Sequence, residues 1–360
     1  MIRKQIDELQ GNEVLGRTLM THDYQVILPK GATLKKEYLQ RLKELGVEEA
    51  YVEKEQAPIV VEEEEEEIQP EMVILKSDIE LSAKNKVKEI LERHTYKRNE
   101  ELSELSQTAD NIINNILSED KIIEQVFDIK QRSSDLYEHS ISVCSMAILT
   151  AIKLGLSKEQ IHDIGIACLL HDIGLRYITV PFTEKDLSEL THNEQSEYMK
   201  HPITGYTALN GEPWLSITAK SIILFHHERM DGSGYPIRNK DLSLECRIVN
   251  ICDAFDEMIC GIGCKRVKVY EAIEYLKAFQ NTKFDGKIVD VFLGFTAVYP
   301  SGTRVLTNEG EIGVVIGQNK GFQDRPIIRI ERDAMGNEPL GEVIKNLVKI
   351  NHIFIEKALD

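Results

Sequence analysis

Residues 226–236 read HHERMDGSGYP, so two adjacent imidazoles and a carboxylate precede a glycine-rich turn. A core helix has no need of these polar groups, and the run is typical of one wall of a metal site. Neighbouring residues on a helix point about 100° apart, so His226 and His227 cannot easily reach one ion, but each can reach a different ion of a close pair. The stretch therefore predicts a centre with more than one metal ion.

The chain upstream offers further ligands at the ends of predicted helices. His171-Asp172 follows the apolar run of residues 164–170, and we expect Gly174 to end that helix. An aspartate in this place can bridge two ions. His201 stands directly before a proline, which fits the first turn of a new helix.

Two more segments complete the predicted ligand set. Asp253 follows residues 248–252, which indicate a buried helix. Asp135 and His139 are spaced i, i+4, so a helix would hold both side chains on one face, about 5–6 Å apart. The predicted ligands are His139, His171, Asp172, His201, His226, His227 and Asp253, with Asp135 as an eighth candidate.

A second His-Asp pair, His162-Asp163, competes with His171-Asp172 for the site. The second pair follows the first at an offset of nine residues, and at about 100° per residue this offset puts the pairs on opposite faces of a continuous helix. His162 follows a polar start at Ser157, which is typical of an N-cap and first turn. We therefore assign the site to the second pair and expect His162 at the surface.

The order of these motifs, with the turn at residues 234–236, resembles the HD-GYP family over about residues 131–300. The resemblance implies an all-helical HD-type domain with a binuclear or trinuclear centre, often of iron or manganese. It also implies hydrolysis of cyclic di-GMP to the linear dinucleotide or GMP, with His171 and Asp172 as catalytic residues. The same seven residues become the ligands, and Asp135 falls where trinuclear members carry a glutamate.

The chemistry of phosphodiester hydrolysis explains why such a cluster is needed. A phosphodiester anion repels hydroxide, and two cations about 3.5–4 Å apart neutralise its oxygens and lower the pKa of a bound water from about 15.7 towards about 7. Mixed imidazole and carboxylate ligands suit iron, manganese or zinc rather than calcium, without choosing among the three. We expect two or three divalent ions and no protein nucleophile.

The chain departs from the family pattern at two cationic positions. Active members usually carry a lysine three residues after the HD aspartate, where this chain has Leu175 followed by Arg176. An arginine-containing run after the Asp253 segment is replaced by residues 262–265, Ile-Gly-Cys-Lys. We therefore predict Arg176, Tyr235 and Lys265 as substrate-binding residues, with Arg176 also catalytic.

Three functions remain open at this point. The ligand set favours a metal-dependent cyclic di-GMP phosphodiesterase. Loss of the family cations favours a catalytically weak member that binds the nucleotide and signals through its flanking modules. A hydrolase of another nucleotide is the third.

Composition limits the partners and the location. The chain has 360 residues, 42% of them hydrophobic, and a formal net charge of -17, which argues against a nucleic-acid polymer because such binding depends on cationic surfaces. The negative net charge does not argue against a dinucleotide, since bound metal ions can neutralise its two phosphates locally. We find neither a membrane segment nor a signal peptide and expect a cytoplasmic protein with reduced cysteines. A homodimer and a signalling protein are candidate partners.

The sequence predicts a mainly α protein in five parts. They are a small N-terminal α/β module (1–55), an acidic linker (56–72), a helical connector (73–130), an HD-GYP domain (131–294) and a C-terminal β extension (295–360). The linker contains six consecutive glutamates, which repel one another and favour a solvated segment. The connector forms either a dimerising helical pair or a layer on the domain's own core.

The two end modules have local patterns of their own. In the first, we predict strands around 14–16 and 25–28, a helix from Lys35 to Leu45 and a strand over 47–52, with a sensory or docking role as a hypothesis. In the last, residues 303–307 and 312–316 predict a hairpin around a glycine turn, followed by a strand over 326–331.

Overall fold

The computed structural model describes residues 2–11, 13–20, 26–44, 47, 49–52, 72–97, 100–118, 125–339 and 341–359. The chain divides into two compact units, residues 1–67 and 68–360. The six glutamates at 62–67 lie outside the described residues, as do Leu45 and Gly46. The domain boundaries expected from the sequence stay predictions.

The N-terminal unit combines two small sheets with one helix. Its elements are β1 (Ile2–Gln5), η1 (Ile6–Glu8), β2 (Leu19–Met20), β3 (Val26–Leu28), α1 (Lys36–Glu44) and β4 (Glu49–Val52). β1 pairs with β4 and β2 with β3, both antiparallel. The predicted helix and the strands near 26 and 49 are confirmed, whereas residues 14 and 15 form only isolated bridges. Leu15, Leu34 and Leu42 form the buried core.

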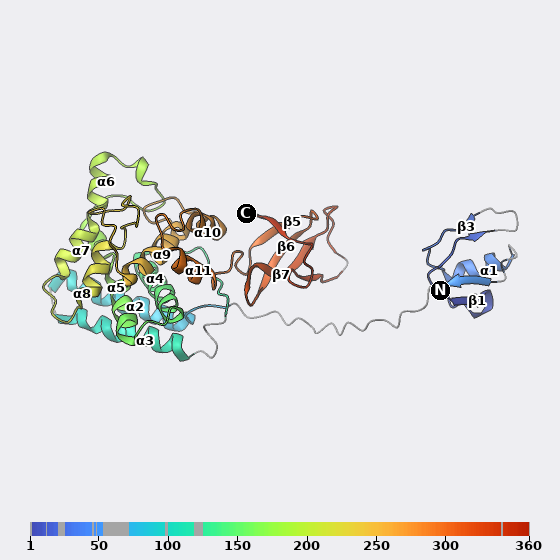
Figure 1. Cartoon of the computed structure of the whole chain (residues 1–360), viewed down its shortest axis with the longest axis horizontal. Helices are drawn as coiled ribbons and strands as arrows, with labels where there is room; N and C mark the ends of the chain where they lie inside the picture. The colour runs from blue at the N-terminus through green and yellow to red at the C-terminus, as the bar shows by residue number, and fades with distance from the viewer. Residues whose placement is uncertain are drawn as a thin grey trace. The chain divides into compact units, whose positions relative to one another are not determined.

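The second unit is mainly helical (Figure 1), which confirms the predicted fold class. Its helices are α2 (Ser77–Lys97), η2 (Glu100–Ser103), α3 (Glu104–Ser118), α4 (Leu136–Lys153), α5 (Lys158–Leu170), η4 (Ile173–Tyr177), η5 (Leu187–Glu189), α6 (His192–Tyr198), α7 (His201–Leu209), α8 (Ile217–Phe225), α9 (Leu244–Cys260), α10 (Val269–Ala278) and α11 (Gly286–Leu293). α4 packs against both α5 and α9 and is buried from residue 139 to residue 151. A helix that is apolar on all sides belongs inside a domain, and α4 accordingly forms its centre.

The connector helices α2 and α3 pack on this same core. α2 contacts α4, α3 contacts α5, and Ile112 and Ile116 are fully buried among the core residues. Of the two alternatives left open by the sequence, packing on the domain's own core is the one that the structure supports.

The chain ends in a five-stranded antiparallel sheet of order β8-β7-β6-β5-β9. The strands are β5 (Arg304–Thr307), β6 (Ile312–Asn319), β7 (Phe322–Arg332), β8 (Ile344–Asn346) and β9 (Ile355–Leu359). The predicted hairpin is confirmed as β5 and β6, with Gly310 in the turn at positive φ, and the strand predicted over 326–331 lies within β7. Val305, Val315 and Ile328 are buried in a core of the sheet's own.

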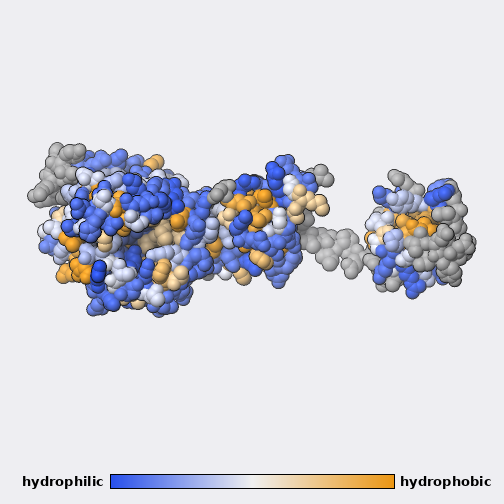
Figure 2. Space-filling model, turned by 90° about the horizontal axis from the view of Figure 1, so that it is seen from above, coloured by the Kyte–Doolittle hydropathy of each residue, from blue (hydrophilic) through white to orange (hydrophobic). Residues whose placement is uncertain are grey.

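On the face shown in Figure 2, hydrophilic residues dominate and hydrophobic residues gather only in separate small patches. None of the helices in the described part of the chain combines the length and the apolar composition that crossing a membrane would need.

The prediction that Gly174 ends the helix before it is wrong. α5 already ends at Leu170, and Gly174 lies within the short helix η4. Its role is close packing instead, because a Cβ atom there would lie 2.0 Å from the carbonyl oxygen of His201. Glycine at this position lets the first turn of α7 approach η4, which brings His201 to the site described next.

Candidate metal centre

Eight ligands were predicted, and seven of them, all except Asp135, converge in the structure. Six lie at helix ends, and Asp253 lies in the middle of α9. His139 lies in the first turn of α4, and His201 is the first residue of α7. His171 and His226 are the C-caps of α5 and α8, so Asp172 and His227 are the first residues beyond those helices. None of the seven is more than 7% exposed. Ligands at the ends of separate helices explain how segments far apart in the sequence meet in one place.

The donor atoms of these side chains form two groups. One contains His139, His171 and Asp253, and the other contains Asp172, His201, His226 and His227; within each group the donor atoms lie within 4.8 Å of one another. The Nε2 atoms of His139 and His171 are 3.2 Å apart, and those of His201 and His226 are 3.1 Å apart. Metal–ligand bonds of about 2.0–2.2 Å place neighbouring donors roughly 3–3.5 Å apart, so these spacings fit shared coordination.

Asp172 faces both groups. Its Oδ1 lies 3.3 Å from Nε2 of His201, and its Oδ2 lies 3.3 Å from Nε2 of His171. One carboxylate oxygen therefore points to each group, which is the arrangement of a bridging aspartate.

Hydrogen bonds on the far side of each ring fix four of the imidazoles. Nδ1 of His171, His201 and His226 donates to the carbonyl oxygen three residues earlier, at 2.7 to 2.8 Å. Nδ1 of His139 donates at 2.7 Å to the carboxylate of Asp256. Because Nδ1 carries the proton, the lone pair of Nε2 is directed into the cluster, as metal ligation requires.

Asp253 gives an independent test of whether the residues fit a metal ion. Its carboxylate is buried, and neither oxygen accepts a hydrogen bond from the described residues. Nε2 of His139 and of His171 lies 3.2 and 3.3 Å from Oδ1, but these nitrogens offer lone pairs rather than protons. A buried carboxylate without donors is costly unless a cation pairs with it, so the donor set fits a divalent ion.

The electrostatics of the cluster also favour positive charge. Burial disfavours imidazolium at His139, but the neighbouring carboxylates of Asp253 and Asp256 outweigh burial and raise the pKa of His139 well above its usual value. At His171 the charge of Asp172 likewise overcomes burial and raises the pKa to about 10. Burial and the neighbouring His226 instead lower the pKa of His227. The carboxylates thus attract cationic charge to one side of the cluster.

The expectation that His226 and His227 serve different groups is only partly right. Both belong to the group with His201, because α8 ends at Phe225 and the 100° rule for a regular helix no longer applies at His227. His227 also approaches Asp253, with Nδ1 3.5 Å from Oδ2. It therefore lies between the two groups.

The glycine turn folds back on the tandem histidines. Tyr235 N donates to the carbonyl oxygen of His227, and the two rings stack with centroids 4.5 Å apart. Gly234 permits this approach, since a Cβ there would lie 2.4 Å from the same carbonyl oxygen. Glu228 is fully buried and accepts from Ile237 N, so it holds the turn rather than facing solvent.

Asp135 is not brought into the cluster. Its carboxylate caps α4 by accepting from Tyr137 N and Glu138 N, and it lies 3.4 Å from Nζ of Lys84. Nε2 of His162, the competing histidine, lies 3.0 Å from Ser106 Oγ and 3.3 Å from Asp110 Oδ1. The side chain is partly exposed, as expected.

The predicted substrate-binding cations have protein partners. Arg176 donates to the hydroxyl of Tyr137, and Nζ of Lys265 pairs with Glu189. Tyr235 and Lys265 line a cavity of about 360 Å³, whose lining does not include Arg176. His227 also lines this cavity, so it gives the cluster an opening of a size that suits a small ligand.

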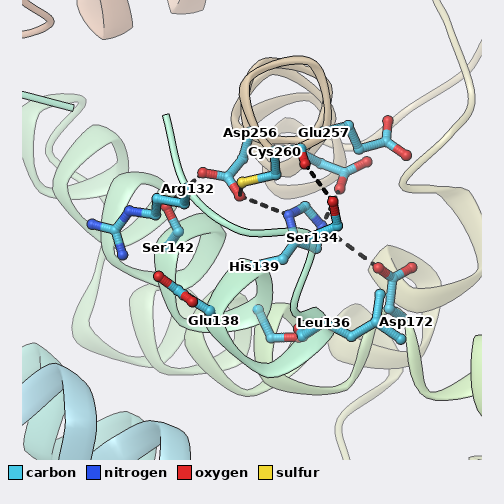
Figure 3. A network of polar contacts seen from close by, with 12 residues as sticks. Arg132, Ser134, Leu136, Glu138, His139, Ser142, Asp172, Asp256, Glu257 and Cys260 are labelled. Atoms are coloured by element: carbon cyan, nitrogen blue, oxygen red, sulfur yellow. Dashed lines mark hydrogen bonds and ion pairs between the residues drawn. The ribbon is translucent and has the colours of Figure 1, made fainter. Parts of the chain in front are cut away.

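Two acidic residues of α9 were missed in the sequence. Asp256 is fully buried and holds His139, which Figure 3 shows between Asp256 and Asp172. Glu257 forms a third group of candidate donors with His227 and Asp253. Their spacing of i+3 and i+4 from Asp253 puts all three carboxylates on one side of a helix, and this spacing could have identified them.

A buried centre of histidines and aspartates at converging helix ends is the defining site of an HD domain. Residues 122–288 match the family model described as an HD domain, and residues 304–360 match a KOW domain associated with HD domains. These matches show an HD domain in the chain, and the motifs and the relatives below make the chain similar to the HD-GYP family. HD domains bind divalent metal ions, and the buried groups offer suitable donors.

Relatives and a solved structure resemble the chain over different lengths. It is 28% identical over 246 residues to a cyclic di-GMP phosphodiesterase of Pseudomonas aeruginosa, covering 67% of this chain and 59% of the relative. It is 37% identical over 152 residues to the cyclic di-GMP phosphodiesterase response regulator RpfG of Xanthomonas campestris pv. campestris, covering 41% and 40%. An HDGYP protein from Bdellovibrio bacteriovorus shares the fold, with a TM-score of 0.52 at 20% identity over 81% of this chain and 97% of that one. The chain thus spans about half the length of these curated relatives.

Proposed function

We propose that the protein is a metal-dependent phosphodiesterase that hydrolyses cyclic di-GMP to linear pGpG or GMP. The observation that carries this proposal is the pair of buried donor groups that share Asp172 beside an open cavity. The names of the two curated relatives support the choice of cyclic di-GMP as substrate.

In this proposal the seven buried side chains bind two divalent ions. His139, His171 and Asp253 would hold one ion, His201, His226 and His227 the other, and Asp172 would bridge them. Ions bound there supply hydroxide at neutral pH and neutralise phosphoryl oxygens. We propose iron or manganese, with zinc as the alternative, because the ligands are imidazoles and carboxylates.

The surrounding residues orient the ligands and shape the substrate cavity. The Nδ1 hydrogen bonds keep the imidazole rings turned so that Nε2 faces the cluster. Tyr235 stacks on His227 at the cavity wall, where a nucleotide would contact it. Lys265 is the cation at the cavity that we propose for a phosphate; a role for Arg176 stays a prediction.

A second candidate, a nucleotide receptor with weak catalysis, has its own support. Lys265 pairs with Glu189 and Arg266 with Glu184, so both cations would have to leave carboxylates to reach a phosphate. The position of the family lysine is occupied by Leu175, which is buried. Such a protein would bind cyclic di-GMP without hydrolysing it.

Hydrolysis by the metal-loaded full chain separates these functions. Protein loaded with Fe²⁺ or Mn²⁺ is incubated with a panel of cyclic dinucleotides, and the products are separated by chromatography. We expect pGpG or GMP from cyclic di-GMP, and loss of at least about 100-fold in rate in Asp172→Asn, since even residues that only orient ligands are worth 10–100-fold. His162→Ala, at the competing His-Asp pair, is the control and should keep the rate.

The other outcomes of this assay decide between the alternatives. Binding of cyclic di-GMP by metal-loaded protein without any product would establish the receptor. Turnover of a different dinucleotide alone would replace the substrate but keep the chemistry. Equal rates for Asp172→Asn and the unchanged protein would exclude the proposed centre.

The proposed partners and location rest on the sequence alone. A homodimer, a signalling protein that docks on the N-terminal unit and a cytoplasmic location are compatible with the proposed role in second-messenger signalling.

A further inference from the structure

Another cavity lies where the helical body meets the C-terminal sheet, and we call it the junction cavity. Its volume is about 410 Å³, against about 360 Å³ for the cavity at the metal centre, and both volumes are typical of sites for small ligands. Among the described residues, none lines both cavities. The junction cavity is lined by residues 130–131 before α4, 268–270 at the start of α10, 298 and 300–304 leading into β5, and 358–359 in β9.

The charged side chains that line the junction cavity are all cationic. They are Lys130, Lys268 and Arg304, and the described lining residues include neither an aspartate nor a glutamate. The chain as a whole has a formal net charge of -17, so this local excess of cations runs against the balance of the molecule. A concave surface lined by charges of one sign concentrates the electric field and attracts ions of the opposite sign. The junction cavity therefore favours an anion.

The three cations can contribute to anion binding although they also interact with the protein. Lys130 and Lys268 are half-buried, so solvent screens their charges less than those of surface lysines. Both take part in other interactions within the chain, which an anion would have to share. Nε of Arg304 donates to Glu331 at 2.9 Å, but a guanidinium has five N–H donors and this ion pair is exposed, so it contributes little to stability.

The rest of the wall suits an organic group joined to the anion. Val298, Pro300 and Leu359 give it an apolar part, and Tyr270 adds an aromatic ring on which a base could stack. The hydroxyl of Thr303 is a donor and an acceptor beside these groups. An apolar wall with a few polar and charged groups is typical of small-molecule sites.

Carboxylates just outside the junction cavity limit the size of the anion. Glu331 pairs with Arg304, and Glu271 accepts a hydrogen bond from Lys268 N at 2.8 Å. These carboxylates would repel the phosphates that flank a bound phosphate in a polymer, and the net charge of the chain already opposes polymer binding. A single phosphate-bearing molecule of nucleotide size avoids this repulsion.

We propose that the junction cavity is a binding site for a phosphate-bearing nucleotide, with Lys130, Lys268 and Arg304 around the phosphate and Tyr270 against the base. This site goes beyond the proposed function, because it shares no described lining residue with the cavity at the metal centre and uses none of the seven ligands. The two cavities are nevertheless close along the chain, since Val267 lines one and Lys268 lines the other.

Hydrogen exchange can locate nucleotide binding in the metal-loaded full chain. The chain is titrated with GMP, guanosine and inorganic phosphate, and exchange is followed by mass spectrometry in residues 298–304, which do not line the cavity at the metal centre. We expect GMP to slow exchange in this segment, guanosine to leave it unchanged, and inorganic phosphate to act only at higher concentration. The same protection by GMP is expected in Asp172→Asn, which alters the metal centre alone.

A pair of lysine variants on α10 tests the role of charge. In Lys268→Gln, the GMP concentration for half-maximal protection should rise at least about 10-fold, since one hydrogen bond between charged groups contributes that much. Lys277→Gln is the matched control, because it removes the same charge from the same helix outside the junction cavity. Circular dichroism checks the fold, and Arg304→Gln replaces Lys268→Gln if the latter does not fold.

The outcomes separate this site from the proposed function. Exchange in residues 298–304 that GMP does not change would overturn the site, as would equal weakening in Lys268→Gln and Lys277→Gln. Equal protection by guanosine or by inorganic phosphate at the same concentration would overturn the assignment of a nucleotide. Protection that disappears in Asp172→Asn would place the nucleotide at the metal centre, so the proposed function would stand and the junction site would fall.

Discussion

Asp256 is not one of the candidate metal donors, but it holds one of them, His139, in position. Its Oδ2 accepts from His139 Nδ1 at 2.7 Å, and its Oδ1 accepts from Ser142 Oγ at 2.6 Å. The carboxylate is fully buried, so its charge acts on the imidazole with little screening. It raises the basicity of His139 and fixes the orientation of the ring.

We expect Asp256→Asn to weaken metal binding by about 10–100-fold while leaving the fold intact. The amide keeps the shape of the side chain but removes the charge that makes His139 a strong ligand. Competition with a calibrated chelator measures the apparent affinity. Asp163→Asn, which alters the competing His-Asp pair on α5, should leave that affinity unchanged; an equal loss in both variants would point to a general effect of charge.

At the scale of single residues, the sequence predicted which side chains lie in the cluster better than it predicted what surrounds a given side chain. The seven buried histidines and aspartates were found from residue type and order, and all lie in the cluster. Asp256 and Glu257 were overlooked because the sequence does not state which carboxylates a helix buries. Asp135 was overvalued for the same reason, since an i, i+4 spacing does not reveal that a carboxylate caps its own helix.

At the level of elements, the contact between η4 and α7 places one of the ligands. Gly174 and Gly205 lie at this contact, and His201 begins α7 directly beside it. A Cβ on Gly174 would lie 2.0 Å from the carbonyl oxygen of His201 and 2.9 Å from Gly205 N. These neighbours are backbone atoms, so a clash cannot be relieved by turning a side chain.

We expect Gly174→Ala to destabilise the protein by about 3 kcal/mol and to reduce its metal content, because α7 must move away and take His201 with it. Urea unfolding and metal analysis measure the two effects. Gly211→Ala is the matched control, since a Cβ there meets no atom within 4 Å and the backbone has no positive φ. Similar stability of the two variants would show that α7 can shift without cost.

The element boundaries explain which helix-based predictions failed. The apolar periodicity predicted that helices lead to the site, and the structure has helices there. However, α5 ends one residue before His171, and α8 ends one residue before His226. Beyond those ends, angles for an ideal helix no longer describe His227 or Gly174. The exact end of a helix depends on tertiary packing, which a single sequence does not specify.

In the second unit as a whole, one buried carboxylate joins segments that are far apart in the chain. Asp128 is 6% exposed and accepts from Met72 N, from Ser301 N and Oγ, and from Gln318 Nε2. Next to it, Phe127 N donates to the carbonyl oxygen of Phe295. Asp128 thus connects the start of the helical body with the C-terminal sheet, and no local sequence pattern predicts such a junction because its partners are up to 190 residues away.

We expect Asp128→Ala to lower the free energy of unfolding of this unit by about 3 kcal/mol, because two backbone N–H groups and the Gln318 amide lose their acceptor while partly or fully buried. Urea unfolding followed by circular dichroism measures the change. Ser301→Ala removes only the hydroxyl bond and should cost about 1 kcal/mol. Metal content should stay constant in both variants, since Asp128 contacts none of the seven ligands in the described hydrogen bonds. An Asp128→Ala protein as stable as the unchanged chain would mean that the sheet is held to the helices by its apolar contacts alone.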